Sequence, residues 1–341
     1  MNKPITTIAT VIAALSISAC QFRPLGEPEY NVTVEMAVNK DKVYNVTSDI
    51  YNPRLERPGL STGMVRCMFY DAKTKELVGQ SFISNKKVNE NGQDVIYGSV
   101  NIAPGTYNLV CYNFDTPNTL VKGENGYETI TAYTSEVPSA VAKSFDIEDV
   151  TKVKKYYDPD HLVVSRDKEL SIVPHTDEYT IKTTAATCID TYYIQVRVRG
   201  GQNISNVIAV IDGLSPENQF GIDSRDTSNP SAVYFTMKRD IDEHLGTEDN
   251  EVICGLFNTF GKIENAPSNA SIVITVTSSE GKKYEKTVSL ENAFKSENAI
   301  KHHWLLIDEV IVIPDPPKPE SSGGFDPRIE DWDDEDAVII L

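Results

Sequence analysis

The segment Asp94–Asn113, DVIYGSVNIAPGTYNLVCYN, contains the pattern that decides the fold. Two runs rich in Val, Ile and Tyr alternate in the way that half-buried β-strands do. Between them stands Ala103-Pro104-Gly105, in which proline presets φ for a tight turn and glycine supplies a positive φ. The segment is therefore predicted to form two strands joined by a tight turn.

The same period of two recurs through most of the chain. Further strands are predicted at Tyr30–Val38, Gly63–Asp71, Leu77–Ser84, Tyr127–Thr134, Lys168–Pro174, Tyr179–Thr184, Ala186–Val198, Val207–Asp212, Ala232–Lys238, Glu251–Phe257, Ser271–Ser278, Lys283–Leu290 and His303–Ile313. No long amphipathic helical pattern separates them. This favours an all-β protein with two antiparallel β-sandwich domains in series over a βαβ fold.

Breaks in the strand pattern suggest the domain limits. The first sandwich is predicted over residues 30–165 and the second over residues 166–313. The interval before the boundary contains Asp158-Pro159-Asp160-His161, which is expected to start a short helical turn. Residues 314–341 form a Pro/Gly-rich, acidic arm, and its four prolines within Pro314–Pro319 favour an extended spacer.

Charge and motifs narrow the function. The 341 residues carry a formal net charge of −18, and a strongly negative surface repels phosphate backbones, so no nucleic-acid partner is expected. The chain lacks a phosphate-binding glycine loop, GxSxG, HExxH and a Cys/His zinc cluster. The acidic run before Ala337 lacks the Asx-Gly pattern of a calcium loop, and a solvated tail is preferred. We therefore predict a non-enzymatic protein with no cofactor and no metal.

The N-terminus, MNKPITTIATVIAALSISAC, predicts export. An early Lys3 precedes an apolar stretch that is too short to cross a bilayer, and Ile17-Ser18-Ala19-Cys20 resembles a bacterial lipobox. Residues 1–19 are predicted to be a lipoprotein signal peptide, Cys20 to carry the lipid, and residues 20–29 to be a tether. The alternative is an ordinary signal peptide with a chance cysteine near its cleavage site.

Four further cysteines leave the disulfide state open. They are Cys67, Cys111, Cys188 and Cys254. Cys67 and Cys111 both fall in predicted strands, and an oxidising compartment would permit a bridge if two strands placed them side by side. The preferred interpretation is that they are small hydrophobic residues in sheet cores.

The chain ends on an apolar run that follows directly on acidic residues. The run consists of Ala337, Val338, Ile339, Ile340 and Leu341. Such an end invites aggregation unless another strand pairs with it. Two interpretations remain open: the run folds back onto this chain's own second domain, or it is donated to another molecule.

In combination, these features resemble the fimbrillin superfamily of Bacteroidetes lipoproteins, especially its accessory and anchor-type subunits. The resemblance rests on Cys20, the strand at Tyr30–Val38, the segment Ala103–Asn113 and the tail Gly323-Gly324-Phe325-Asp326-Pro327 with Trp332. It implies two transthyretin-like sandwich domains and a lipid-anchored subunit involved in fimbria assembly and cell adhesion. Its implied location is the cell outer membrane, facing the cell surface or the fimbrium, with other fimbrial subunits as partners.

The resemblance also implies a mode of assembly. Shaft subunits of the family lose an N-terminal strand by proteolysis after a basic residue, and a neighbour's C-terminal strand fills the groove by β-augmentation. Here Ala337–Leu341 would be the donor, and Arg54 or Arg57 the early cleavage site. Because Pro58 disfavours cleavage after Arg57, a subunit that keeps its lipid and stays at the membrane is the favoured prediction.

A surface glycan-binding lipoprotein is the alternative function, because tandem β-sandwiches on a lipid anchor also capture polysaccharides. Sugar-binding platforms usually need exposed aromatic rings, tryptophan above all. The two tryptophans are Trp304, inside a predicted strand, and Trp332, in the tail. This disfavours a tryptophan-based site and leaves tyrosine-based sites open.

Overall fold

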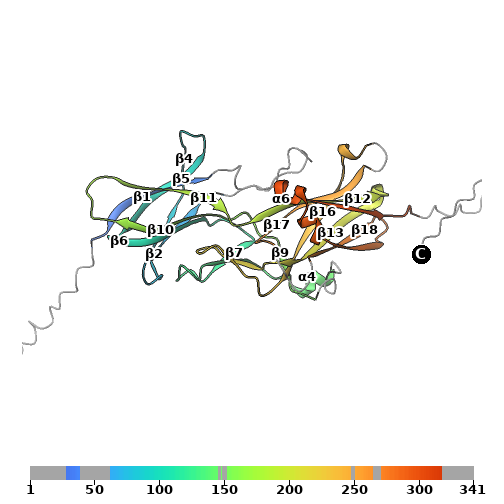
Figure 1. Ribbon diagram of the computed structural model, residues 1–341, viewed down its shortest axis with the longest axis horizontal. Helices are drawn as coiled ribbons and strands as arrows, with labels where there is room; N and C mark the ends of the chain where they lie inside the picture. The colour runs from blue at the N-terminus through green and yellow to red at the C-terminus, as the bar shows by residue number, and fades with distance from the viewer. Residues whose placement is uncertain are drawn as a thin grey trace, which may run out of the picture.

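The computed structural model describes residues 28–38, 62–144, 147, 152–246, 250–263 and 270–316. In these ranges the regular structure is almost entirely β, and two large sheets follow one another along the long axis of the molecule (Figure 1). The predicted all-β, two-domain fold class is therefore confirmed. No helix within the described ranges is both long enough and apolar enough to cross a membrane.

Eight strands form the first sandwich. They are β1 (Tyr30–Val38), β2 (Val65–Asp71), β3 (Leu77–Ile83), β4 (Asn85–Val88), β5 (Asp94–Ile102), β6 (Gly105–Asn113), β10 (Val163–Ile172) and β11 (Tyr179–Thr187). Their order in the sheet is β3-β2-β6-β10-β11-β1-β5-β4. β5 pairs with β1 and β4, whereas β6 pairs with β2 and β10. The turn at Ala103-Pro104 therefore carries the chain to a different part of the sheet and does not close a hairpin.

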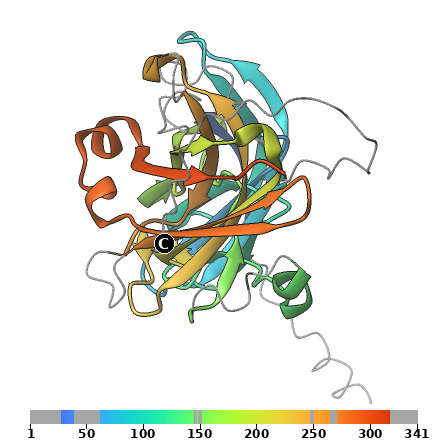
Figure 2. The same cartoon turned by 90° about the vertical axis from the view of Figure 1, so that its right-hand side faces the viewer.

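The second sandwich has its own large sheet. Its strands are β12 (Asp190–Arg199), β13 (Ile204–Leu214), β16 (Ser231–Ile241), β17 (Glu251–Thr259), β18 (Ser271–Ser278), β19 (Lys283–Ser289) and β20 (Trp304–Val312). They follow the order β19-β18-β13-β16-β17-β12-β20, and β9 (Lys155–Tyr157) joins beside β16. Figure 2 looks onto this end of the molecule, where α5 (Glu291–Phe294) and α6 (Glu297–His302) pack beside β20.

Short elements complete the fold. A small sheet has the order β15-β14-β8-β7, with β7 (Thr119–Lys122), β8 (Thr131–Thr134), β14 (Glu217–Gln219) and β15 (Ser224–Arg225). The remaining elements are α4 (Ser139–Ser144) and the 3₁₀ turns η1 (Gly201–Asn203) and η2 (Glu243–Leu245). Because β14 pairs with β8, this sheet joins the two halves of the chain.

Three strand pairs are parallel, although the sequence predicted antiparallel sandwiches. They are β1 with β11, β12 with β20 and β9 with β16. The chain also crosses the predicted boundary at residue 165 in both directions. The first sheet continues to Thr187 of β11, while β9 lies before the boundary and pairs into the second sheet.

A shared core joins the two sandwiches. Tyr70 and Tyr112 of the first sandwich and Phe220 and Phe260 of the second belong to one cluster, and each is at most 2% exposed. The ring centroids of Tyr112 and Phe220 lie 5.2 Å apart in an edge arrangement, which favours aromatic contact. The sandwiches therefore pack as one body.

The segment Asp158–His161 passes through this junction as an extended connection, so the helical turn predicted there is wrong. Amide side chains hold its backbone from both sides. Asn258 Nδ2 donates to the Pro159 carbonyl at 2.8 Å, and Asn113 Nδ2 donates to the His161 carbonyl at 3.0 Å. These tertiary hydrogen bonds satisfy carbonyls that a helical turn would have paired locally.

Two side chains of this segment have opposite effects on acid stability. Burial lowers the pKa of His161 to about 4, so the stability it gives the folded chain is lost as the pH falls from about 6.5 to 4. Burial, and then the charge of Asp160, raises the pKa of Asp158 to about 6. The folded state then binds a proton first, and this carboxyl adds stability as the pH falls from about 6 to 4.

We therefore expect Asp158→Asn to make the protein acid-labile. Without the compensating carboxyl, lowering the pH from 7 to 4.5 should cost the variant about 2 kcal/mol more than the wild type. Urea unfolding at both pH values measures the difference. The matched variant His161→Gln should shift in the opposite direction, and parallel pH profiles for all three proteins would contradict the assignment.

Candidate functional site

The first strand occupies a central position in the first sandwich (Figure 1). β1 pairs along its whole length with β5 in the antiparallel sense, and Val32–Val38 pair with β11 in the parallel sense. β2, the next described strand along the chain, does not pair with it. We call the edges of β5 and β11, with the core side chains between them, the β1 slot. Both backbone edges of β1 are thus hydrogen-bonded to strands distant in sequence.

Side chains on one face of β1 fill the core. Val32, Val34 and Met36 are fully buried and Val38 is 1% exposed, as the alternation in sequence predicted. Each contributes about 1.5–3 kcal/mol by burial. The fit at the centre is close, because a Cβ added to Gly98, opposite Val34, would lie 2.7 Å from Ile83. Removing β1 would expose these contacts and two unpaired strand edges.

Aromatic rings hold the start of β1. The ring of His175 lies 5.1 Å from that of Tyr30 and 5.2 Å from that of Tyr179, measured between centroids. His175 Nε2 also lies 3.2 Å from the carbonyl oxygen of Asn31. The entry of the tether into the sandwich is therefore fixed in place.

The last described residues leave from the other end of the molecule. Ile313 N donates to the Arg199 carbonyl at 2.9 Å, and Asn203 Nδ2 donates to Asp315 Oδ1 at 3.0 Å. Gly200 has φ 76°, and a Cβ there would lie 2.1 Å from the Ile313 oxygen, so only glycine fits this approach. Figure 1 shows the start of β1 in blue and the end of β20 in red at opposite ends of the long axis.

The residues predicted to act at the two termini lie outside the described ranges. These are Cys20, the cleavage candidates Arg54 and Arg57, and the donor run Ala337, Val338, Ile339, Ile340 and Leu341. The structure describes the β1 slot and the point where the arm begins. The roles of these terminal residues stay predictions.

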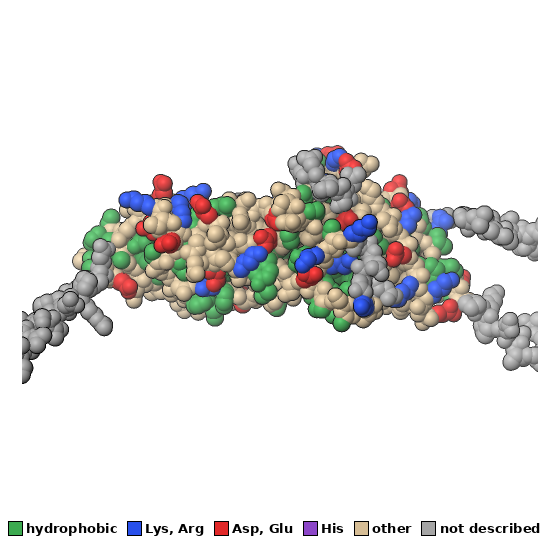
Figure 3. All heavy atoms as spheres, turned by 90° about the horizontal axis from the view of Figure 1, so that it is seen from below, with side chains coloured by type: hydrophobic (Ala, Val, Ile, Leu, Met, Phe, Trp, Pro, Cys, Tyr) green, Lys and Arg blue, Asp and Glu red, His purple; other side chains and the backbone are tan. Residues whose placement is uncertain are grey.

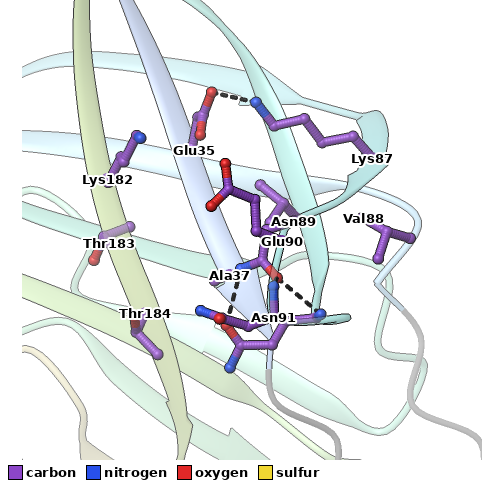
Figure 4. A pocket seen from close by; sticks show the side chains of 12 residues that line it. Glu35, Ala37, Lys87, Val88, Asn89, Glu90, Asn91, Lys182, Thr183 and Thr184 are labelled. Carbon is purple, nitrogen blue, oxygen red and sulfur yellow. Dashed lines mark hydrogen bonds and ion pairs between the residues drawn. The ribbon is translucent and has the colours of Figure 1, made fainter.

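A polar pocket of about 570 Å³ opens beside β1 (Figure 4). Its lining includes Glu35 of β1, Lys87 of β4, Asn91 of the following turn, and Lys182 and Thr184 of β11. Glu35 and Lys87 form an ion pair across it. None of its lining residues is aromatic, so the pocket offers charge and hydrogen bonds but no stacking surface for a sugar ring.

Exposed aromatic side chains gather instead where β2, β3 and β6 lie side by side. Phe82 is 50% and Phe114 is 45% exposed, and their ring centroids lie 5.1 Å apart. The guanidinium of Arg66 lies 5.6 and 5.4 Å from these two rings, and it also binds Gln80 and Glu124. The sequence analysis missed this patch, although Phe82 falls on the polar face of its strand.

The remaining candidates do not form a site for chemistry. Trp304 is only 6% exposed and stacks on His302, with centroids 4.4 Å apart, so it is not a surface platform. Within the described part of the chain, no three His, Cys, Asp or Glu side chains are grouped so that they could hold a metal ion. On the face shown in Figure 3, acidic and basic side chains are interspersed and neither sign forms a continuous patch.

Sequence comparisons bear on these features. Residues 84–236 match the family described as "Domain of unknown function (DUF5119)". A curated relative, the "Putative fimbrium anchoring subunit Fim4B" of Bacteroides ovatus, is 24% identical over 276 residues. The match covers 71% of this chain and 77% of the relative.

Solved structures share the fold. A "putative adhesin" from Bacteroides ovatus ATCC 8483 aligns over 86% of this chain and 95% of its own, with 21% identity and a TM-score of 0.53. Another, from Bacteroides thetaiotaomicron VPI-5482, aligns over 85% and 93%, with 10% identity and a TM-score of 0.50. Together with the sequence match, these findings confirm the predicted resemblance to fimbrial proteins of Bacteroidetes.

Proposed function

We propose that this protein is a non-enzymatic, anchor-type fimbrial subunit at the cell surface, held to the outer membrane by a lipid on Cys20. The observation that carries the proposal is the seating of β1, which fills its slot with paired edges on both sides and buried side chains. A subunit that retains this strand also retains the tether that precedes it. The curated relative, a fimbrium anchoring subunit by name, supports this role.

The placement of β1 suits an anchor under load. Cys20 precedes Tyr30 by ten residues, a span of at most about 33–36 Å when extended. A pull on the fimbrium would enter at the end of β20 and leave through β1, at the opposite end of the molecule. The shared core around Phe220 carries that load between the sandwiches, and the two ladders of β1 carry it to the tether.

The C-terminal arm supplies the link to the next subunit in this proposal. Residues 317–341 follow the last described residue, and 25 extended residues reach about 80 Å at most. Ala337–Leu341 would add a strand to a neighbour's open groove, with backbone hydrogen bonds giving affinity and alternate side chains filling pockets. The acidic run ahead of this segment would keep it soluble until then.

A truncation after Pro319 tests the arm. We expect the shortened chain to keep the melting temperature of the full chain and to lose co-assembly with the other fimbrial subunits, measured by pull-down from outer-membrane extracts. The matched control is Val338→Asp with Ile340→Asp, which keeps the arm's length and should lose assembly equally. Lower monomer stability with unchanged assembly would show that the segment pairs with its own domain.

A further inference from the structure

Cys67 and Cys111 face one another inside the first sandwich. They are direct partners in the register of β2 with β6, and both are fully buried. The Cys111 thiol donates to Cys67 Sγ, and the two sulfur atoms lie 3.3 Å apart. Of the two conditions considered from sequence, the placement of the strands side by side is therefore met.

The other two buried cysteines have different surroundings. Cys188 lies in the shared core, where its thiol reaches the Leu162 carbonyl at 3.6 Å. Cys254 lies with Tyr193 and Trp304 in another cluster. Cys67 and Cys111 share the core of the β1 slot, together with Val34. The geometry thus selects one pair among the four cysteines.

We propose that Cys67 and Cys111 are joined by a disulfide bond in the exported protein, which rests on the surface location of the proposed function. A disulfide has an S–S length of about 2.0 Å, and residues directly opposite in an antiparallel pair are close enough for it after small side-chain rotations. Two S–H bonds break and one S–S bond forms. The two electrons and two protons pass to the disulfide of an exported thiol–disulfide oxidoreductase, which becomes a dithiol.

The bond forms while the chain folds. The hydrogen bond with Cys111, together with burial, raises the pKa of Cys67 well above its usual value, so the closed core holds a thiol and not the reactive thiolate. No oxidant reaches two fully buried sulfur atoms. Oxidation therefore precedes the seating of the core side chains of β1.

The bond would stabilise the slot itself. It closes the chain from β2 to β6, and the enclosed segment includes β5, which forms one edge of the slot. The bond thus ties the β5 edge to the sheet whether or not β1 is seated. A sandwich whose central strand is exchangeable gains most from such a link, because the empty slot would otherwise be free to collapse.

Peptide mapping without reduction tests the proposal on the full chain extracted from outer membranes. After alkylation in denaturant, we expect a Cys67–Cys111 crosslinked peptide and alkylated Cys188 and Cys254. A reducing agent should lower the melting temperature by about 5 °C in the wild type and leave Cys67→Ala/Cys111→Ala unchanged. The control Cys188→Ala should keep the wild-type response. Alkylation of both Cys67 and Cys111 would overturn the proposal.

A parallel refolding experiment separates the bond from the location. Reduced, denatured full chain is refolded with oxidised glutathione and mapped in the same way, and we expect the same crosslink. Reduced cysteines in the membrane extract together with the crosslink in vitro would overturn the disulfide through the compartment and would count against the surface location. Absence of the crosslink in vitro would overturn the pairing and leave the anchor role intact.

Discussion

Replacing Val34 with Asp is expected to unseat β1 and unfold the first sandwich. Val34 is fully buried between Gly98 of β5 and Ile181 of β11, so a carboxylate there loses its water and gains no partner. A buried unpaired charge costs about 4 kcal/mol or more, a large fraction of a domain's total stability. Urea unfolding followed by near-UV circular dichroism measures the loss.

Thr33→Asp is the matched control, because Thr33 lies next to Val34 and points to the other, partly exposed face. It should cost less than about 1 kcal/mol. A synthetic strand with the sequence of residues 28–40, added in excess, should partly restore the Val34→Asp protein by filling the slot in its place. Equal losses for both variants would show that the slot does not depend on the inward side chains of β1.

Phe220→Ala is expected to uncouple the two sandwiches. Phe220 is fully buried in the shared core and contacts Tyr112 across the junction. Removing a buried phenyl ring costs about 3–5 kcal/mol. We expect differential scanning calorimetry to show one cooperative transition for the wild type and two for the variant. Because the loss falls on the contacts between the sandwiches, the earlier transition marks the half that depended on its neighbour.

Ile222→Ala controls for a change in the same loop, since Ile222 is 41% exposed. Its transition should remain single and shift little. A single, unshifted transition for Phe220→Ala would mean that the junction is held by the hydrogen bonds around Asp158–His161 and not by the aromatic core.

Local alternation was enough to predict many strands from sequence. β1, β5 and β18 match the predicted ranges residue for residue, because each has one buried face and a strict period of two. β9 and β14 have three residues each and were missed, since so short a run shows no period. The partner of a strand is not a local property, which is why the parallel pairs and the crossings near residue 165 were not foreseen.

The candidate site was predicted unevenly for the same reason. The buried face of β1 was foreseen, whereas its position between β5 and β11 depends on contacts across the whole domain. Whether Cys67 meets Cys111 depends on the register of β2 with β6, and the sequence left it open. The Phe82 and Phe114 patch arises because neighbouring strands bring together residues that appear scattered along the chain.

The parallel ladder of β1 also sets an order of events during synthesis and export. Val32 pairs with Tyr179, 147 residues further along, so the first strand to be made waits for one of the later strands before its second edge is satisfied. Pairing over such a separation is slow and leaves an apolar segment exposed to other chains. With Cys20 held in the membrane as proposed, the waiting strand stays close to the surface where the rest of its own chain is delivered. The lipid would then act in biogenesis as well as in attachment, favouring capture of the strand by its own domain over capture by a neighbour.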